Sequence, residues 1–388
     1  MKPRILIVTG SYPGPESPVA GVFIQDQARV LSRRFDVAVL VLKPRWVSGR
    51  ELIGFREYPP AREEADGRIQ VLRQEVMLPV DGGFRFLEPV LRILAGQTLE
   101  RALKAWGRPS LIHAHVAWPA GWAAAALANL VKAPLVLTEH TGPFAGLMRF
   151  PALTRTAGRV LARADRVLAV SPALASQMRE FFPALSVDVL GNVVLTEFFS
   201  PPAQAPAGGP FRFLSAALLD PLKGMDYLLD AAKMLRDGGA RSFSLTVAGD
   251  GSSLSGLKER AKALGIADMT DFPGLLPREA LRDAMRESRA FVLPSLGETF
   301  SVVLGEAASC GLPVVATLCG GPEFVVTREM GVLVPRADAA ALADAMAALL
   351  SGRAHFDPGA ARRSVASRFG EEAFLDDISR AYAPFLQE

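Results

Sequence analysis

Residues 291–316 read FVLPSLGETFSVVLGEAASCGLPVVA. The stretch opens on the apolar run 291–293, continues through a helix-length segment that reaches Cys310, and closes on a second apolar run, 314–316. Short runs that are apolar on both faces are typical of parallel strands covered by helices. The stretch therefore predicts a strand, a helix and a second strand parallel to the first.

The same alternation of short apolar runs and amphipathic, helix-length stretches continues along the chain. The strands that it predicts are 5–8, 37–42, 69–75, 111–114, 135–138, 167–170, 187–190, 211–216, 244–248, 291–293 and 314–316. This pattern indicates an α/β protein with doubly wound, Rossmann-like sheets.

A segment rich in proline and glycine, between Phe199 and Phe211, has no apolar periodicity and is the expected linker. It divides the chain into an N-terminal domain, 1–200, and a C-terminal domain, 201–370, which we expect to face each other across a cleft. A last helix, Glu371–Tyr382, lies within residues 371–388, and we expect it to pack back on the first domain.

Composition excludes several classes of protein. Half of the 388 residues are hydrophobic and only 21% are charged, which excludes a disordered, fibrous or coiled-coil chain. Two cysteines are too few for a disulfide framework or a thiolate zinc site, and the four histidines show no metal-ligand spacing. Carboxylate-bound magnesium stays open. The low cysteine content fits a reducing cytoplasm. We expect no membrane span, because no apolar stretch is long enough.

Four strand-to-helix turns carry glycine, which leaves main-chain N–H groups free to meet an anion. They contain Gly21, Lys223-Gly224, Gly297-Glu298 and Gly320-Gly321. Each glycine could equally be an ordinary turn or cap residue. Together, and with a lysine in one turn, they indicate a ligand that carries phosphate. The chain has neither a P-loop sequence nor a dinucleotide fingerprint after its first strand, which disfavours a nucleotidase and a dehydrogenase.

Two glutamates stand out in the quoted stretch. Glu306 lies among almost entirely apolar neighbours, where an unpaired carboxylate would cost several kcal/mol, so we expect it to have a partner. Glu298 stands at the turn before the helix and could be a simple first-turn acid. The spacing also lets the pair reach opposite ends of an elongated polyol ligand.

The sequence resembles the retaining family 4 glycosyltransferases, the glycosyl transferases group 1, over nearly its whole length. The residues that carry the resemblance are Pro294, Ser295, Glu298, Thr299, Phe300, Ser301, Glu306, Gly311, Pro313, Gly320, Gly321 and Glu323, with further matches at Tyr12, Gly21, His113, His115, His140, Lys223 and Gly249. The resemblance implies the GT-B fold, with a nucleotide-sugar donor on the C-terminal domain and the acceptor on the N-terminal domain.

Specific roles follow from the resemblance. The implied donor-binding residues are Gly21, Lys223, Leu275, Leu276, Glu298, Thr299, Phe300, Ser301, Leu304 and Glu306, with Leu275 and Leu276 beside the nucleobase. Glu306 would hold the ribose hydroxyls and Glu298 the hydroxyls of the donor sugar. Glu298, His140 and Lys223 form the implied catalytic set. Neither a metal nor a cofactor is expected, because Lys223 and the Gly21 turn would neutralise the diphosphate.

One position departs from the family. An arginine usually stands five residues before the phosphate lysine, but here that position is Leu218. Either another cation completes the diphosphate site or the leaving group is stabilised less than usual.

The histidines of the first domain follow predicted strands. His115 and His140 both come at carboxyl ends, which suits a ligand site, although a lone histidine is often structural. The resemblance favours His140 as the donor contact and leaves His115 for the acceptor side. We expect His113 to point into the packing.

The net charge of +3 conceals a positive excess in the N-terminal half and a negative excess in the rest. Two basic amphipathic segments, 84–108 and 147–166, indicate either solvated faces of docked helices or contact with an anionic membrane surface. The expected acceptor is a glycan or a lipid-linked sugar of envelope or polysaccharide synthesis, and peripheral contact with the inner membrane face is possible. Nucleic acid is not expected. The alternatives are a related hydrolase or epimerase of nucleotide sugars and a non-catalytic sugar-binding protein.

Overall fold

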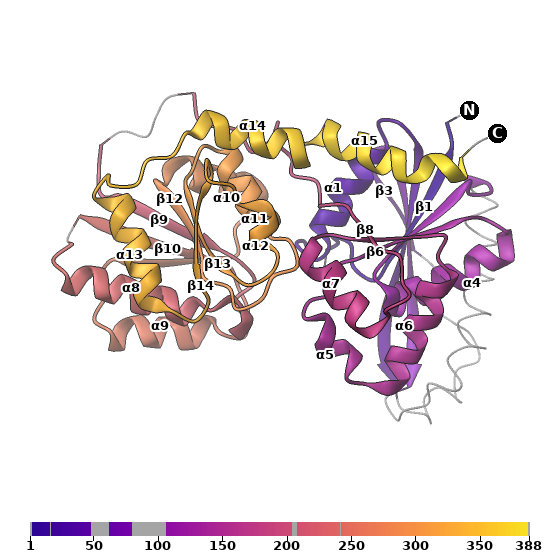
Figure 1. The fold of residues 1–388 in the computed structure, drawn as a ribbon, viewed down its shortest axis with the longest axis horizontal. Coiled ribbons are helices and arrows are strands. Elements are labelled where there is room, and N and C mark those ends of the chain that lie inside the picture. The colour runs from indigo at the N-terminus through magenta and orange to yellow at the C-terminus, as the bar shows by residue number, and fades with distance from the viewer. Residues whose placement is uncertain are drawn as a thin grey trace. The chain divides into compact units, whose positions relative to one another are not determined.

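The computed structural model describes residues 2–15, 17–47, 62–79, 106–203, 208–240 and 242–386. The chain divides into two compact units. Unit 1 comprises Met1–Asn192 with Phe374–Glu388, and unit 2 comprises Val193–Ala373. Each has a Rossmann-like parallel sheet with helices on its faces (Figure 1).

Unit 1 contains an eight-stranded sheet in the order β3-β4-β2-β1-β5-β6-β7-β8. All neighbours are parallel except β3 and β4. The strands are β1 Arg4–Thr9, β2 Asp36–Val47, β3 Arg62–Asp66, β4 Ile69–Pro79, β5 Leu111–His115, β6 Leu135–Glu139, β7 Arg166–Ala169 and β8 Asp188–Val189. The helices are α1 Val22–Leu31, the π-helix η1 Ala117–Gly121, α4 Trp122–Val131, α5 Phe144–Met148, α6 Pro151–Arg163 and α7 Pro172–Phe181.

Unit 2 contains a six-stranded, fully parallel sheet in the order β11-β10-β9-β12-β13-β14. Its strands are β9 Phe211–Ala216, β10 Phe243–Ala248, β11 Thr270–Gly274, β12 Ala290–Leu293, β13 Val314–Leu318 and β14 Gly331–Pro335. Its helices are η2 Pro221–Lys223, α8 Met225–Asp237, α9 Leu254–Ala263, α10 Arg278–Glu287, α11 Val302–Ser309, α12 Pro322–Val325, α13 Ala339–Leu350 and α14 Pro358–Phe369. In Figure 1, α8, α9 and α13 cover one face of this sheet, and α10 and α11 cover the other. The strand-helix-strand prediction for 291–316 is confirmed as β12, α11 and β13.

The boundary between the units precedes the segment that the sequence suggests as the linker. Val194 N–H donates to the Phe369 carbonyl at 2.8 Å, and both N–H and hydroxyl of Thr196 donate to Glu371. These bonds attach the residues just after Asn192 to unit 2.

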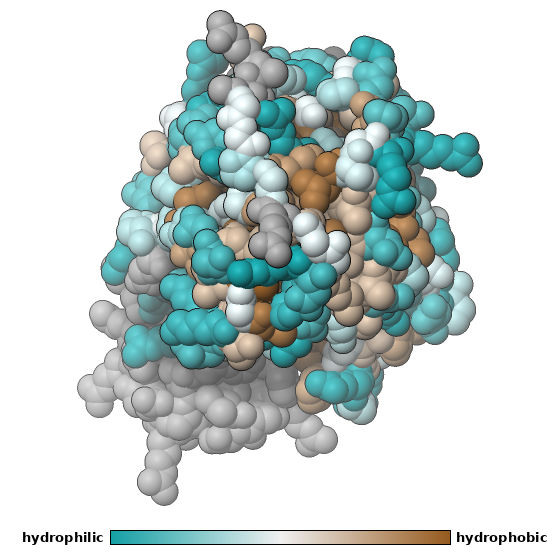
Figure 2. Space-filling view, turned by 90° about the vertical axis from the view of Figure 1, so that its left-hand side faces the viewer, coloured by the Kyte–Doolittle hydropathy of each residue, from teal (hydrophilic) through white to brown (hydrophobic). Residues whose placement is uncertain are grey.

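The surface seen in Figure 2 is mainly hydrophilic, with hydrophobic residues in smaller patches between the polar ones. None of the helices in the described ranges is long and apolar enough to cross a membrane. The predicted basic segment 84–108 lies almost entirely outside those ranges.

The last helix, α15 Glu371–Tyr382, ends on the sheet of unit 1. The Tyr382 side chain is fully buried, and its hydroxyl lies 2.7 Å from His113 Nδ1. His113 Nε2 lies 2.7 Å from Thr138 Oγ1. His113 thus packs inside the domain, as the sequence predicts, and both of its nitrogens are used to join the last helix to β6.

We expect Tyr382→Phe to lower the free energy of unfolding by about 1–3 kcal/mol, because it leaves His113 Nδ1 buried without its partner. Urea unfolding of the variant and the parent protein measures the difference. Tyr227→Phe, at a partly exposed tyrosine of unit 2, is the matched control and should unfold like the parent. Equal stability of all three proteins would contradict the role of this hydrogen bond.

Candidate active site

In unit 2, the strand order reverses between β9 and β12, whose connections lead to opposite sides of the sheet. Ligands of such sheets bind beyond the carboxyl ends of these two strands. Here the two loops touch, because Leu296 N–H donates to the Leu222 carbonyl at 2.7 Å. Gly224 has a φ of 60°, and a Cβ at this position would clash with the Pro294 carbonyl oxygen. Glycine is therefore required for the loops to meet.

Lys223 and Glu298 form an ion pair at this point. Lys223 Nζ lies 2.8 Å from Glu298 Oε1, which also accepts a hydrogen bond from Ser295 Oγ at 2.7 Å. The side chains are 22% and 12% exposed, so the pair is mostly shielded but still reachable. Glu298 Oε2 accepts no hydrogen bond from the residues that the structure describes. The structure thus brings together two residues that the sequence predicts separately.

The Gly320-Gly321 turn after β13 packs against the same loop. Gly321 N–H donates to the Glu298 carbonyl at 2.9 Å, and a Cβ at Gly321 would clash with the main chain of Phe300. The Glu323 carboxylate accepts the Gly320 N–H at 2.8 Å. Glu323 therefore holds this turn in place.

The N-terminus of α11 carries backbone strain. Ser301, which precedes the helix, has a φ of 76°, a region that non-glycine residues rarely adopt. Its Oγ is buried and has no hydrogen-bond partner in the described part of the chain. A buried hydroxyl without a partner is a candidate ligand contact.

Other predicted residues of this helix and its turn differ in exposure. Phe300 and Leu304 are 1% and 0% exposed, so neither presents its side chain to a ligand. The Leu304 N–H already donates to the Ser301 carbonyl at 3.2 Å. Thr299 is partly exposed.

Glu306 is 8% exposed and has the partner that its apolar setting predicts. Arg278 Nη2, from α10, lies 3.6 Å from Glu306 Oε1. The Arg278 guanidinium also lies 5.5 Å from the ring centres of Phe198 and Phe199. Nothing in the sequence pattern singles out Arg278.

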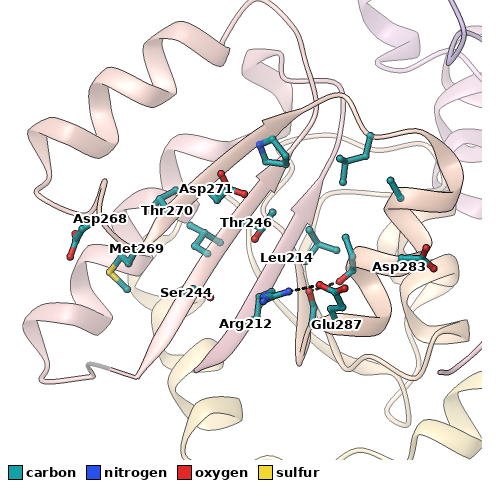
Figure 3. Close-up of a pocket in the computed structure, with 16 residues that line it drawn as sticks. Arg212, Leu214, Ser244, Thr246, Asp268, Met269, Thr270, Asp271, Asp283 and Glu287 are labelled. Carbon is teal, nitrogen blue, oxygen red and sulfur yellow. Dashed lines mark hydrogen bonds and ion pairs between the residues drawn. The ribbon is translucent and has the colours of Figure 1, made fainter. Parts of the chain in front are cut away.

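Leu275 is exposed, whereas Leu276 lines a cavity of about 810 Å³ along β9, β10, β11 and α10 (Figure 3). The charged residues of its lining are mainly acidic, and its one arginine, Arg212, pairs with Glu287 at 2.7 Å. An acidic lining repels a diphosphate. This cavity is therefore unsuited to the phosphate end of a nucleotide.

Leu218, at the position of the missing arginine, is 62% exposed. The loop after β12 has another cation beside it, since Arg336 Nη1 donates to the Leu296 carbonyl at 3.3 Å. Arg336 follows β14 and is not among the residues that the sequence analysis names.

In unit 1, the strand order reverses between β1 and β5. Gly21, the N-cap residue before α1, has a φ of 72°, and a Cβ there would clash with the Ser11 carbonyl, which makes glycine necessary. Beyond β5, Val116 has a φ of 67°, an unusual conformation for a β-branched residue. Strained backbone concentrates at functional sites, and here it lies where such a sheet binds its ligand.

Three histidines cluster behind these turns. His115 Nδ1 lies 2.9 Å from His140 Nε2, and the Phe23 ring of α1 lies 4.9 Å from the His140 ring. His115 Nε2 and His140 Nδ1 are buried without partners among the described residues. His115 is fully buried and His140 is partly exposed. His115, predicted for the acceptor side, thus directly contacts the predicted donor residue.

Burial keeps these imidazoles neutral. Burial lowers the pKa of His113 to about 3. Burial, together with a smaller effect of the neighbouring His113, also lowers the pKa of His140 to about 3. Burial and the two neighbouring histidines hold the pKa of His115 well below its ordinary value. Two neutral rings that share one hydrogen bond have one donor and one acceptor left on their outer nitrogens.

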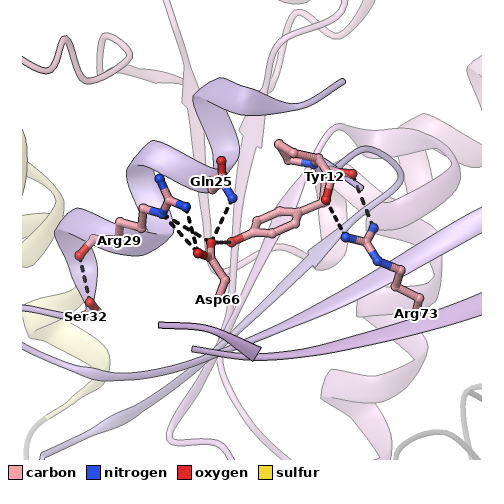
Figure 4. Close-up of polar contacts among 7 residues, drawn as sticks. Tyr12, Gln25, Arg29, Ser32, Asp66 and Arg73 are labelled. Atoms are coloured by element: carbon pink, nitrogen blue, oxygen red, sulfur yellow. Dashed lines mark hydrogen bonds and ion pairs between the residues drawn. The ribbon is translucent and has the colours of Figure 1, made fainter. Parts of the chain in front are cut away.

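A carboxylate that the sequence does not single out holds the loop after β1. Asp66 accepts hydrogen bonds from Tyr12 Oη at 2.8 Å, Gln25 Nε2 at 2.9 Å and Arg29 Nη2 at 2.7 Å (Figure 4). Burial raises the pKa of Asp66, but these hydrogen bonds outweigh burial and hold it below the usual value. Burial raises the pKa of Tyr12, and the nearby charge of Asp66 raises it further.

No cluster of three or more histidine, cysteine, aspartate or glutamate side chains in the described ranges has a geometry that could hold a metal ion.

The comparisons with known proteins agree on one family. Residues 210–352 match the family model "Glycosyl transferases group 1", and residues 20–192 match "Glycosyl transferase 4-like domain". The D-inositol 3-phosphate glycosyltransferase of Segniliparus rotundus is 30% identical over 94% of this chain and 84% of its own length. The glycogen synthase of Mycobacterium tuberculosis is 31% identical over 67% of this chain, but the match spans only 63% of the synthase.

Solved structures show the same fold. The Anabaena HepE protein, in complex with UDP and glucose, superposes with a TM-score of 0.72 over 99% of this chain and 100% of its own, at 19% identity. The two Rossmann-like sheets, the two family models and the near full-length relative together mean that the chain belongs to the group 1, family 4 glycosyltransferases of the GT-B fold.

Proposed function

We propose that this glycosyltransferase transfers a sugar with retention of its anomeric configuration, from a nucleotide-sugar donor to a glycan or a lipid-linked acceptor, without a metal ion or a cofactor. The observation that carries the proposal is the Lys223–Glu298 pair beyond β9 and β12. It places a cation and a hydrogen-bond acceptor within 2.8 Å of each other, at the point where such a sheet binds its ligand.

The pair suits a sugar attached to a diphosphate. An ammonium group has three donors, so Lys223 can keep its bond to Glu298 and still donate to phosphate oxygens. Glu298 Oε2 is left to accept sugar hydroxyls. The N-terminus of α11 and Ser301 Oγ add donors that favour negative charge on the departing diphosphate. Arg336 is our candidate for the cation that Leu218 does not supply.

Glu306 is assigned to the ribose hydroxyls because a carboxylate can accept both at once. Arg278 would orient this carboxylate through their ion pair. Thr299 and Phe300 would contribute main-chain contacts, and Leu275 and Leu276 would lie beside the base.

In unit 1, Gly21 would present the N-terminus of α1 to the diphosphate. His140 would contact the donor sugar as a neutral ring. His115 would set the tautomer of His140 through the hydrogen bond that the two rings share. HepE holds UDP and glucose in its crystal structure, which supports a donor of this type for the present chain.

We infer that the acceptor is polar, and either small or glycan-like. The Segniliparus rotundus relative is a D-inositol 3-phosphate glycosyltransferase, which supports this inference. Of the arginines in segment 147–166, Arg163 and Arg166 pair with Asp165 and Asp188. The exposed Arg149, Arg155 and Arg159 are left as the candidates for peripheral contact with an anionic membrane.

Glu306→Gln should mainly weaken nucleotide binding, and Lys223→Ala should cost about 1–3 kcal/mol of UDP binding through the lost charge-assisted contact. Calorimetry with free UDP and GDP measures both effects. Lys233→Ala, at a surface lysine of α8, and Glu259→Gln, at an exposed glutamate of α9, are matched controls and should bind like the parent. Unchanged nucleotide affinity of Glu306→Gln would remove the ribose assignment.

Transfer should retain the anomeric configuration, as the resemblance to retaining enzymes implies. It should also persist in EDTA, because phosphate neutralisation is assigned to Lys223 and helix N-termini. Proton NMR of the product formed from a panel of UDP, GDP, ADP and dTDP sugars checks both points. An inverted product, or strict dependence on magnesium, would contradict the proposal. Donor turnover that no acceptor accelerates would instead favour the hydrolase alternative.

The dependence of kcat on pH should show no inflection near 6.5 from His140, because its pKa lies near 3 and the ring is neutral from pH 5 to 8. A pH–rate profile of the parent and of His115→Gln measures this. In the variant, kcat should fall about tenfold or more, because the tautomer of His140 is no longer set. A profile that loses activity below pH 6.5 in the parent but not in His140→Gln would overturn the neutral-ring assignment.

A further inference from the structure

Glu139, the last residue of β6, is a fully buried carboxylate that none of the assignments above uses. A buried charge is costly unless hydrogen bonds replace its lost hydration. Glu139 Oε1 accepts hydrogen bonds from the His140 N–H at 2.9 Å, the Thr141 N–H at 2.8 Å and the Thr141 hydroxyl at 2.6 Å. Its Oε2 accepts the Ala117 N–H at 2.8 Å. All four donors are neutral groups, and the carboxylate is the acceptor for each of them.

These donors belong to the two turns that carry the candidate histidines. Strand β5 ends at His115, and Ala117 follows two residues later. Strand β6 ends at Glu139, and His140 comes next. The two strands are parallel neighbours, with His115 opposite Thr138, so they end at the same edge of the sheet. Glu139 therefore joins the turn after β5 to the turn after β6.

The turn after β5 is strained and needs such a connection. Val116 has a φ of 67°, a conformation that persists only when the surrounding structure enforces it. The Val116 N–H donates to the Thr138 carbonyl at 2.9 Å, and the next N–H along the chain, that of Ala117, donates to Glu139. Two consecutive hydrogen bonds to β6 thus hold the strained residue, and one of them ends on the Glu139 carboxylate.

The same connection sets the spacing of the two histidine rings. Nδ1 of His115 lies 2.9 Å from Nε2 of His140, and such a bond weakens when the rings move apart or tilt. His115 directly precedes the strained Val116, and the main-chain N–H of His140 is itself bound to Glu139. A shift of either turn would therefore weaken the bond between the rings.

We propose that Glu139 is a positioning residue, which holds the turns after β5 and β6 together so that the His115–His140 hydrogen bond keeps the His140 ring oriented toward the donor sugar. The inference rests on the proposed function, in which His140 contacts the donor. A carboxylate is required because all four contacts need an acceptor. A glutamine side chain has one acceptor oxygen, so its NH2 group would face either the Ala117 N–H or the donors of the other turn.

NMR of the histidine rings tests the positioning directly. The chain has four histidines, so labelling histidine alone with nitrogen-15 gives few signals, which His115→Gln and His140→Gln assign. In the parent, the ring N–H that His115 and His140 share should exchange slowly with water. In Glu139→Gln it should exchange about tenfold faster or more, because the turn after β5 is released.

Asp165→Asn is the matched control for this measurement. Asp165 Oδ2 accepts the main-chain N–H of Leu135 at 2.8 Å, at the first residue of β6. The control thus alters a carboxylate that binds the main chain at the opposite end of the same strand. The ring signals of Asp165→Asn should match those of the parent.

Thr141→Val is a second variant, which decides the question if Glu139→Gln does not fold. It removes the shortest of the four hydrogen bonds and keeps the carboxylate. The shared ring N–H should then exchange about threefold faster. Unchanged exchange in Glu139→Gln, or in Thr141→Val where the first variant does not fold, would overturn the inference. The same acceleration in Asp165→Asn would overturn it as well.

Donor turnover separates positioning from a general loss of structure. In Glu139→Gln, kcat should fall about tenfold while KM for the donor changes less than about twofold, because a misplaced ring fails mainly in the transition state. UDP affinity, measured by calorimetry, should stay at the parent level. Faster exchange of the ring N–H with unchanged kcat would confirm that Glu139 holds the rings but contradict the role of His140 in the proposed function.

Discussion

Parallel pairing of β9 with β12, and of β1 with β5, is the constraint from which the candidate site follows. In each pair the two parallel strands end at the same edge of the sheet, and the segments that follow them turn to opposite faces. The loops after the two strands can therefore meet only where the strands end. In unit 2 this brings Lys223 against Glu298, although many residues separate them in sequence. In unit 1 it brings the turn at Gly21 and the strained residue Val116 to a common edge. The sheet thus determines which loops meet, and hydrogen bonds between side chains then set the final positions of the polar groups.

Much of this arrangement could be predicted from the sequence. The strands with apolar, β-branched runs were predictable, and all lie in the two sheets. The strands β3, β11 and β14 were not. Arg62–Asp66 is almost entirely polar, Thr270–Gly274 contains a proline and ends on glycine, and Gly331–Pro335 begins and ends with residues that usually mark turns. All three are edge strands, which need apolar residues less than central strands do.

For the site, residue type was predictable and partnership was not. The apolar neighbours of Glu306 predicted that it has a partner. That this partner is Arg278 depends on how α10 packs beside α11, which the sequence does not show. Asp66 gave no signal because a lone aspartate before Gly67 reads as an ordinary turn residue. Only the tertiary structure brings Tyr12, Gln25 and Arg29 to it. Contacts between residues distant in sequence cannot be read from local pattern.

The contact between Tyr382 and His113 has a consequence for synthesis of the chain. Unit 2 is a continuous stretch and can complete its core as soon as it has left the ribosome. Unit 1 begins first but lacks the segment Phe374–Glu388, which is translated after unit 2. The buried histidine of unit 1 therefore has no tyrosine partner until the whole of unit 2 has been translated. The domain whose synthesis starts first thus completes its core only after the other domain has been made.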